Sequence, residues 1–440
     1  MSAFARTSLS VMTLLISAGA AAQAAPDGLF YRLGLGIEYS DNIARRPIAV
    51  ADTVLSPSFG FAYTAQGARG EFEAAGTTSY RHYQQGRFDD EWLNQLGASG
   101  RWIFIPERLS WEMQAAVSDQ PINSFDTDSP DNRQRTEVIN TGPTLALRLS
   151  STARVLAELR YLKTSAQRTS EFNGDRLGAN LRAFLALSPI STVSAELEST
   201  DVRYDNVGAT PDYRRDNAFM KWAHQGRRGE WSAEAGYSRA RFDLPVAGND
   251  RSASIPLISI AAAYRIGELG RVEVQLDRGF GDSAQDLLNA VPRAEDFSLP
   301  IGRPVLRGAA LSGDLFKQTG GTFGFSRRDE TIYLRFDGSW RRQEYLQSSG
   351  LDQTIRGFTV SANRQVRATF SLGAQAGVEW RRFGQTSRRD RDTRIGLLAN
   401  WQSSRRTGVS FEVSHGKRTS TDAQQIYDDN RAILTFTLVR

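Results

Sequence analysis

Apolar residues fall on every second position in one stretch of this sequence after another. In residues 32–46, RLGLGIEYSDNIARR, the apolar side chains run from Leu33 to Tyr39 at alternate positions, and the pattern stops at Asp41. A period of two indicates a β-strand with one apolar face and one polar face. We find no long amphipathic helix, and the alternation returns in residues 177–187, 332–340, 370–380 and 432–438. The pattern therefore predicts an all-β fold.

The connections between these segments alternate between short and long. Short polar turns, such as residues 66–68 and 225–227, take turns with longer polar stretches such as residues 120–135. A meander with tight turns at one end and long loops at the other is the layout of an outer-membrane barrel. We predict an antiparallel up-and-down transmembrane β-barrel of about 20 strands, or about 18, formed as one domain by residues 25–440. The alternative, a soluble sandwich or solenoid, would give shorter strands without this regular alternation.

The tryptophans favour membrane insertion. All eight lie near the ends of the predicted strands, as do Trp102 and Trp111 on either side of the turn at Pro106. Aromatic girdles at the two lipid–water boundaries produce this placement, whereas a soluble core would bury several tryptophans in mid-strand. We therefore expect the apolar face of each strand to meet lipid and the polar face to line the lumen.

The N-terminus carries a predicted export signal. Residues 1–24 contain a positive charge at Arg6, an apolar run and the small-x-small sequence Ala22-Gln23-Ala24, which are typical of a cleaved signal peptide. We expect cleavage before Ala25 and localisation in the outer membrane of a Gram-negative cell. The chain has no cysteine, which excludes disulfides, thiol chemistry and a cysteine-linked lipid anchor.

Charge balance argues against a nucleic-acid-binding protein, and the placement of the histidines argues against an enzyme. The 54 Lys and Arg residues nearly balance the 49 Asp and Glu residues, so we expect no nucleic acid as a partner. His82, His224 and His415 are far apart, and none can be placed beside a partner in a catalytic arrangement. We predict that the protein is not an enzyme and has no cofactor and no metal site.

Three segments carry a resemblance to a known family. They are LGIEYSDNI, PERLSWEMQAAVSDQP and SPDNRQRTEVINTGPTL, and the similarity is strongest over residues 33–149. Together with the signal peptide, they resemble the β-barrel porin-2 group, and within it the EpsL-like outer-membrane proteins associated with exopolysaccharide biosynthesis. The resemblance implies a porin-like barrel that serves export or assembly of a surface exopolysaccharide.

Other functions stay open at this point. The main alternative is a non-conducting barrel that docks export components of the envelope, and weaker alternatives are a general diffusion porin and an outer-membrane enzyme. The expected partners are outer-membrane lipid and lipopolysaccharide, with polysaccharide and export-machinery proteins as further candidates.

The predicted lumen face is polar and charged. Arginines and carboxylates are interleaved along it, so either cross-strand ion pairs brace the wall or the arginines form a track for an anionic polymer. The interleaving favours bracing. The candidate lumen-lining residues are Arg32, Arg101, Arg148, Arg160, Arg182, Arg335, Arg341 and Arg381.

An Asp-Asn dipeptide recurs at the long-loop ends of the predicted strands. Such side chains form turns by bonding to nearby backbone, and we favour that interpretation. Alternatively, a ring of their oxygens could bind divalent cations or sugar hydroxyls. The candidate outer-rim residues are Asp41, Asn42, Asp131, Asn132, Asp205, Asn206, Asp429 and Asn430.

Two expectations concern the long loops and the seam of the barrel. The longest loop, residues 281–312, contains a candidate short helix at residues 284–291, and this loop either folds into the lumen or stays exposed. The sheet must close, because unpaired backbone groups in lipid cost several kcal/mol each. We therefore expect residues 33–39 to pair with residues 432–438, with Ser40 beside Asp428 or one residue either way.

Overall fold

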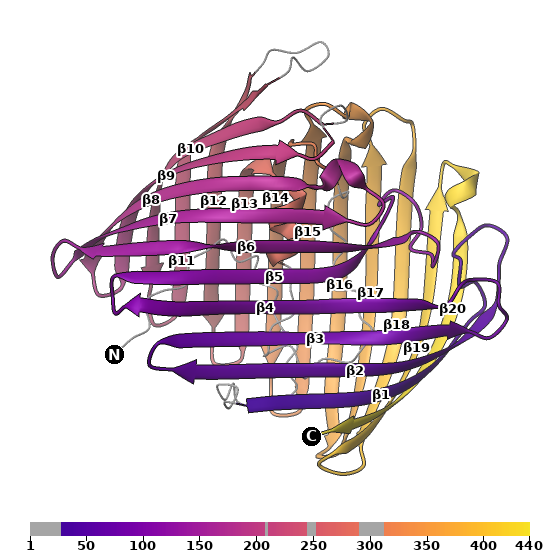
Figure 1. Cartoon of the computed structure of the whole chain (residues 1–440). Helices are drawn as coiled ribbons and strands as arrows, with labels where there is room; N and C mark the ends of the chain where they lie inside the picture. Colours follow the sequence, from indigo (N-terminus) through magenta and orange to yellow (C-terminus); the bar gives the residue numbers. More distant parts are fainter. Residues whose placement is uncertain (1–27, 207–209, 244–251, 290–311) are drawn as a thin grey trace.

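The chain closes into a single barrel (Figure 1). The computed structural model describes residues 28–206, 210–243, 252–289 and 312–440, and in these residues 20 antiparallel strands form one sheet. Each strand pairs with the next along the chain, and β1 (Gly28–Ser40) also pairs with β20 (Tyr427–Val439). The prediction of an up-and-down barrel is confirmed. The predicted signal peptide lies outside the described residues.

The remaining elements follow in chain order. The next nine strands are Asp52–Gly67 (β2), Gly70–Tyr83 (β3), Glu91–Ile105 (β4), Leu109–Pro121 (β5), Arg133–Arg148 (β6), Ala153–Ala166 (β7), Gly174–Ser188 (β8), Ser191–Tyr204 (β9) and Tyr213–Gln225 (β10). The other strands are Gly229–Phe242 (β11), Ser252–Ile266 (β12), Gly270–Gly281 (β13), Phe316–Arg328 (β14), Ile332–Tyr345 (β15), Gln353–Arg367 (β16), Phe370–Phe383 (β17), Arg389–Gln402 (β18) and Thr407–Ser420 (β19). The short helical segments are Ser170–Phe172 (η1), Ser283–Asn289 (α1), Ser349–Leu351 (η3) and Ala423–Gln425 (η4). Within the described ranges, no helix is both long and apolar enough to cross a membrane.

The two faces of each strand meet different surroundings. In β1, Leu33 and Ile37 are exposed to 46% and 42%, whereas Glu38 and Ser40 on the opposite face are exposed to 6% and 0%. The outward faces of neighbouring strands thus join into an apolar belt, which is the surface that lipid requires. The polar faces line the lumen, as the alternation predicts.

The tryptophans lie on the outward face at two heights. Those near the short turns are Trp102, Trp111, Trp222 and Trp401, and those near the long loops are Trp92, Trp340 and Trp380; all seven are exposed. This arrangement matches the two aromatic girdles expected at the membrane boundaries.

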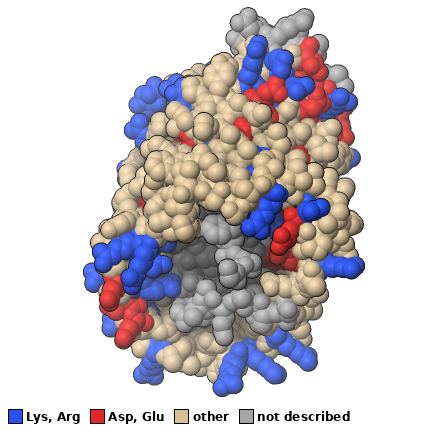
Figure 2. All heavy atoms as spheres, turned by 90° about the vertical axis from the view of Figure 1, so that its left-hand side faces the viewer, with Lys and Arg blue, Asp and Glu red and all other residues tan. Residues whose placement is uncertain are grey.

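The two ends of the barrel differ in their connections. The short turns and the two strand termini, Gly28 and Val439, lie at one end, which we term the short-turn end, and the longer connections lie at the other, the long-loop end. Figure 2, which faces the left-hand side of Figure 1, shows a hollow with Lys and Arg side chains at several places around it. Several short turns carry neighbouring arginines, such as Arg227-Arg228 and Arg405-Arg406.

The seam between β1 and β20 has a different register from the expected one. Ser40 lies opposite Arg431, and Leu35 lies opposite Phe436. The expected neighbour, Asp428, faces outward and Ser40 faces the lumen, so pairing them would place a lipid-facing side chain in a lumen-facing row. The pairing of the two strands is confirmed, and the predicted register is wrong, because Arg431 lies three residues from Asp428 and outside the expected margin of one residue.

Candidate functional site

Ion pairs between strands that are adjacent or one strand apart brace the lumen wall. Arg101 on β4 and Arg160 on β7 both contact the Glu112 carboxylate on β5, each at 2.8 Å. Arg182 on β8 contacts Glu196 on β9 at 2.5 Å. Opposite charges placed across neighbouring strands hold the strands in register. These contacts support the bracing interpretation, because the carboxylates break up an arginine track.

The other candidate lumen arginines occupy different heights. Arg335 contacts Asp337 at 2.6 Å on the same strand, and Arg32 is buried on the inner face of β1. Arg148 is exposed at the short-turn end of β6, where it donates to the Ser150 carbonyl at 3.3 Å. Arg341 and Arg381 lie near the long-loop end, where the constriction described below is built.

The Asp-Asn residues form turns and seam contacts. Asp41 accepts hydrogen bonds from the Asn430 backbone and side chain at 2.8 and 2.7 Å. Asn42 is buried and donates to the carbonyls of Arg46 and Asp428 at 2.7 and 3.0 Å. Asp429 accepts from the Ser40 hydroxyl at 2.6 Å, so it belongs to strand β20 and not to a turn.

The remaining candidate rim residues behave in the same way. The Asn132 side chain donates to the carbonyls of Asn123 and Thr127 at 2.8 and 3.1 Å, and Asp131 pairs with Arg46. Asp205 and Asn206 are exposed directly after β9. Over the described ranges, no group of three or more His, Asp or Glu side chains is arranged to hold a metal ion. The geometry favours turn formation.

The β5–β6 loop crosses the outer mouth of the barrel. Residues 122–132, the crossing loop, leave β5 and reach β17, nearly halfway round the ring. Arg381 donates to the Ser124 carbonyl at 2.8 Å, and Arg388 donates to the Phe125 carbonyl at 2.5 Å. The Phe125 ring packs edge-on against Phe383 with 5.1 Å between ring centroids.

Two further contacts hold the crossing loop to the seam side of the mouth. Arg45 in the β1–β2 loop pairs with Asp128 at 3.3 Å and with Asp429 at 3.2 Å. Gln425 in η4 donates to Asp126 at 3.0 Å. The crossing loop is therefore anchored at both ends and along its length.

The helix α1 lies inside the barrel. It follows β13, yet Ala284 and Leu287 are buried against the inner wall of β5 to β7, where they meet Ala116, Val138 and Leu162. Asp282, just before α1, pairs with Arg176 on β8. The helix predicted at residues 284–291 is thus observed as Ser283–Asn289, and it lies in the lumen; residues 290 and 291 lie outside the described ranges.

The chain also packs inside the barrel just before β14. Leu315 is buried among Val202, Tyr213 and Phe242, which lie on β9, β10 and β11. Asp314 accepts hydrogen bonds from the backbone of Gln347 and Ser348 at 3.0 and 2.7 Å. We term residues 122–132, 282–289 and 312–315 the mouth segments, because together they constrict the long-loop end of the lumen.

Burial and neighbouring charges shift the pKa values of three groups at the mouth, namely two acids in the mouth segments and one arginine in the β1–β2 loop. Burial raises the pKa of Asp286 to about 6, although the Arg341 guanidinium works against this rise. Burial likewise raises the pKa of Asp314 to about 6, against the pull of the backbone N–H groups that it accepts. Burial alone would lower the pKa of Arg45, but the Asp128 and Asp429 carboxylates outweigh it and raise that pKa.

Sequence reasoning missed most residues of this constriction. The missed side chains include Phe125, Phe383, Arg388 and Asp286. One signal was present: Phe125 stands in an otherwise polar loop, NSFDTD, where an aromatic side chain needs an apolar partner. The partner itself cannot be deduced from the sequence, because Phe383 meets Phe125 only after the ring has closed.

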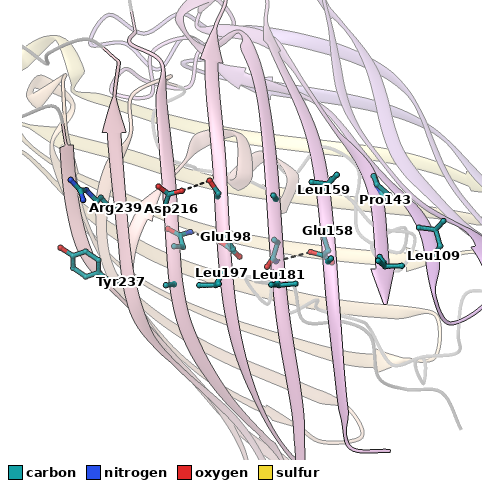
Figure 3. Close-up of a pocket in the computed structure, with 17 residues that line it drawn as sticks. Leu109, Pro143, Glu158, Leu159, Leu181, Leu197, Glu198, Asp216, Tyr237 and Arg239 are labelled. Carbon is teal, nitrogen blue, oxygen red and sulfur yellow. Dashed lines mark hydrogen bonds between the residues drawn. The ribbon is translucent and has the colours of Figure 1, made fainter. Parts of the chain in front are cut away.

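A depression of about 900 Å³ lies on the outward wall, across β5 to β11 (Figure 3). Exposed apolar side chains of the lipid-facing rows line most of it, including Leu159, Leu181, Leu197 and Tyr237. Such a surface suits acyl chains of the membrane. The depression is therefore not the candidate ligand site, which is the constricted lumen.

The closed ring, the apolar belt and the aromatic girdles define the class of this protein: it is a large outer-membrane β-barrel. No protein-family model matches the chain, and no curated protein matches it significantly. The resemblance to the porin-2 group therefore stays a prediction.

Solved structures share the fold. The siderophore receptor PirA from Acinetobacter baumannii matches with a TM-score of 0.53 at 7% identity, over 94% of this chain and 81% of that chain. A mutant of the ferric enterobactin receptor PfeA from Pseudomonas aeruginosa matches with a TM-score of 0.50 at 10% identity, over 94% of this chain and 81% of that chain. Another PfeA mutant, in complex with enterobactin, matches with a TM-score of 0.51 at 10% identity, over 95% of this chain and 82% of that chain. At these identities the likeness concerns the barrel fold.

These findings correct the function expected from the sequence. The matching barrels are described as receptors for siderophores, and not as porins, exporters of polysaccharide or enzymes. The prediction that the barrel serves export or assembly of an exopolysaccharide, with polysaccharide as a partner, is therefore wrong.

Proposed function

We propose that the protein is an outer-membrane transporter that takes up a small polar ligand, such as a metal chelate, through a lumen gated at its outer mouth. The observation that carries the proposal is the crossing loop, held across the mouth by Arg381 and Arg388. A passage crossed in this way excludes large solutes until its contacts rearrange. The siderophore receptors that share the fold support this choice of ligand class.

The chemistry of the two arginines suggests how a ligand opens the mouth. Both guanidinium groups donate to neutral backbone carbonyls of the crossing loop, although each also contacts a carboxylate on its own side: Glu379 at 3.1 Å and Asp390 at 2.7 Å. Hydrogen bonds to a charged acceptor are stronger than those to a neutral one. An anionic chelate therefore competes for the guanidinium groups and releases the loop.

The test is a binding measurement on the purified, folded barrel in detergent. Ferric catecholate and ferric hydroxamate chelates are titrated against the wild type, the double variant Arg381→Gln/Arg388→Gln and a matched control, Arg214→Gln/Arg241→Gln. The control arginines lie on the outward face at the same end, where both pair with Asp216.

We expect one chelate class to saturate the wild type and the control alike. The double variant should bind about tenfold more weakly, because it lacks two charge-assisted hydrogen bonds. Absence of binding to either chelate class would overturn the ligand class, and equal affinity of all three proteins would overturn the role of the mouth.

A further inference from the structure

Five arginines lie together on the outward face of β15 to β18, near the long-loop end. We term them the outer arginine patch: Arg342, Arg356, Arg382, Arg389 and Arg391, all of them exposed. The strand register sets their positions. Arg342 lies opposite Thr354, Thr354 opposite Arg382, and Arg382 opposite Arg389, which makes one row across four strands.

The adjoining row alternates arginine with tryptophan. Trp340 lies opposite Arg356, Arg356 opposite Trp380, and Trp380 opposite Arg391. The guanidinium carbon of Arg391 lies 5.9 Å from the centre of the Trp380 ring. Because tryptophan marks the lipid–water boundary, this row places the patch at headgroup height.

The positive charge of the patch is poorly balanced. Arg342 pairs with Glu344, but the other four guanidinium groups make no ion pair within the described part of the chain. Arg382 and Arg389 stand directly opposite each other, and like charges in that position destabilise a sheet. The fold therefore accepts an unfavourable arrangement that an anion would relieve.

The carboxylates that neighbour the patch along β18 face the other way. Asp390 and Asp392 alternate with Arg389 and Arg391 along β18, but strand parity turns them into the lumen. There Asp390 pairs with Arg388 at 2.7 Å and Asp392 with Arg418 at 2.9 Å. The alternation thus sorts acids inward and bases outward.

A second outward cluster at the same end shows that this imbalance is not general. On β9 to β11, Arg203 pairs with Asp201 at 3.0 Å, and Arg214 and Arg241 pair with Asp216 at 3.1 and 2.5 Å. Those arginines are also exposed, yet each has a carboxylate partner on the same face. The outer arginine patch differs because four of its five guanidinium groups lack such a partner within the described part of the chain.

Beside the patch, toward the short-turn end, the wall is apolar. Phe358, Val360 and Ile395 are exposed to 48%, 50% and 53% on the same outward face. A molecule that fits this surface has anionic groups at headgroup height and acyl chains along the strands. Guanidinium groups bind phosphate oxygens bidentately, which makes phosphate the fitting anion.

We propose that the outer arginine patch binds the phosphate groups of an acylated, phosphorylated sugar lipid, the lipid A portion of lipopolysaccharide, in the outer leaflet. The long-loop end of such a barrel faces outward, so this lipid is the one that meets the patch. The bound lipid neutralises the opposed Arg382 and Arg389 and holds β15 to β18 against the membrane. This site is separate from the lumen and does not depend on the ligand that the lumen takes up.

The test uses native mass spectrometry of the folded, full-length barrel in detergent. The triple variant Arg382→Gln/Arg389→Gln/Arg391→Gln and the control Arg203→Gln/Arg214→Gln are titrated with lipid A, dephosphorylated lipid A and phosphatidylglycerol. Retention of the heat-modifiable shift on a gel confirms that each variant is folded.

We expect wild type and control to bind lipid A equally and the triple variant to bind it about tenfold more weakly, since three charged donors are lost. Dephosphorylated lipid A should bind the wild type as weakly as lipid A binds the triple variant. Equal binding of lipid A by all three proteins would overturn the site. Equal binding of phosphatidylglycerol and lipid A by the wild type would show a general affinity for anionic lipid and overturn the assignment to lipid A.

Discussion

Asp286 links the closure of the mouth to pH. Its carboxylate lies inside the barrel, where it faces Arg341 on β15, Asp277 on β13 and Asp282 before α1. Burial raises its pKa to about 6, whereas an exposed aspartate titrates near about 4. The docked helix therefore prefers the protonated acid.

The sign of the pH effect follows from this shift. As the pH rises from about 4 to about 6, the Asp286 carboxyl loses its proton when α1 has left the inner wall but keeps it when α1 is packed there, so the packing of α1 weakens. Above about 6 the carboxyl is ionised in both states, and its effect on the packing of α1 no longer changes with pH. We predict that channel conductance in planar bilayers rises over this window and that Asp286→Asn flattens most of the rise. The pKa of Asp314 is raised in the same way, and we expect this residue to account for the rest of the rise in conductance. An unchanged pH profile in Asp286→Asn would contradict this role.

Leu181 and Asn180 test the assignment of the two faces. Leu181 points outward and is 48% exposed, while the neighbouring Asn180 points inward and donates to Glu158 at 3.3 Å. Leu181→Arg should lower the free energy of unfolding by about 2–4 kcal/mol if the site lies at the bilayer midplane. Asn180→Arg should cost much less, because it adds a cation beside Glu158 in a polar lumen. Urea unfolding in lipid vesicles measures both, and equal costs would mean that the faces are misassigned.

At the scale of elements, the seam is the contact that closes the sheet. Ser40 and Arg431 face each other across β1 and β20, and both side chains point into the lumen. Since cross-strand neighbours lie well within the roughly 7 Å between Cα atoms that a disulfide allows, Ser40→Cys/Arg431→Cys should crosslink under mild oxidation.

The matched control for the seam is Ser40→Cys/Asp428→Cys. Asp428 lies three positions away in the register and points outward, so this pair should stay reduced in the folded protein. Non-reducing gel mobility distinguishes the two variants. Crosslinking of the control in preference to the first pair would show that the register is wrong.

Sequence reasoning predicts strands far better than it predicts loop contacts. The alternation in residues 33–39 gives the strand and its lipid face directly, because side-chain direction has a period of two. Strand parity alone already excludes Asp428, which faces outward, as the neighbour of Ser40, which faces the lumen. The actual neighbour, Arg431, could not be deduced, because parity fixes which face a residue occupies and not how far two strand ends overlap. The contact between Phe125 and Phe383 was missed because it depends on the position of two strands almost opposite each other in the ring.

At the scale of the whole molecule, closure of the ring determines both the membrane surface and the site. Pairing β1 with β20 leaves no strand edge in lipid, where each unpaired backbone group would cost several kcal/mol. The same closure brings the β5–β6 loop within reach of β17 and places α1 against β5 to β7. The outer mouth is thus a product of the topology and not of any single motif.

The most direct test of the gated lumen is single-channel recording in planar bilayers. The wild type is compared with a barrel whose residues 283–311 are replaced by a short Gly-Ser linker and whose crossing loop is cut to a tight turn. A barrel of 20 strands has room for an aqueous channel once nothing crosses it. We predict a large, steady conductance for the shortened barrel, and a far smaller conductance for the wild type even above a pH of about 6, where the docking of α1 is weakest. A wild type that already conducts as well as the shortened barrel would contradict the gate, and so would a folded, shortened barrel that stays closed.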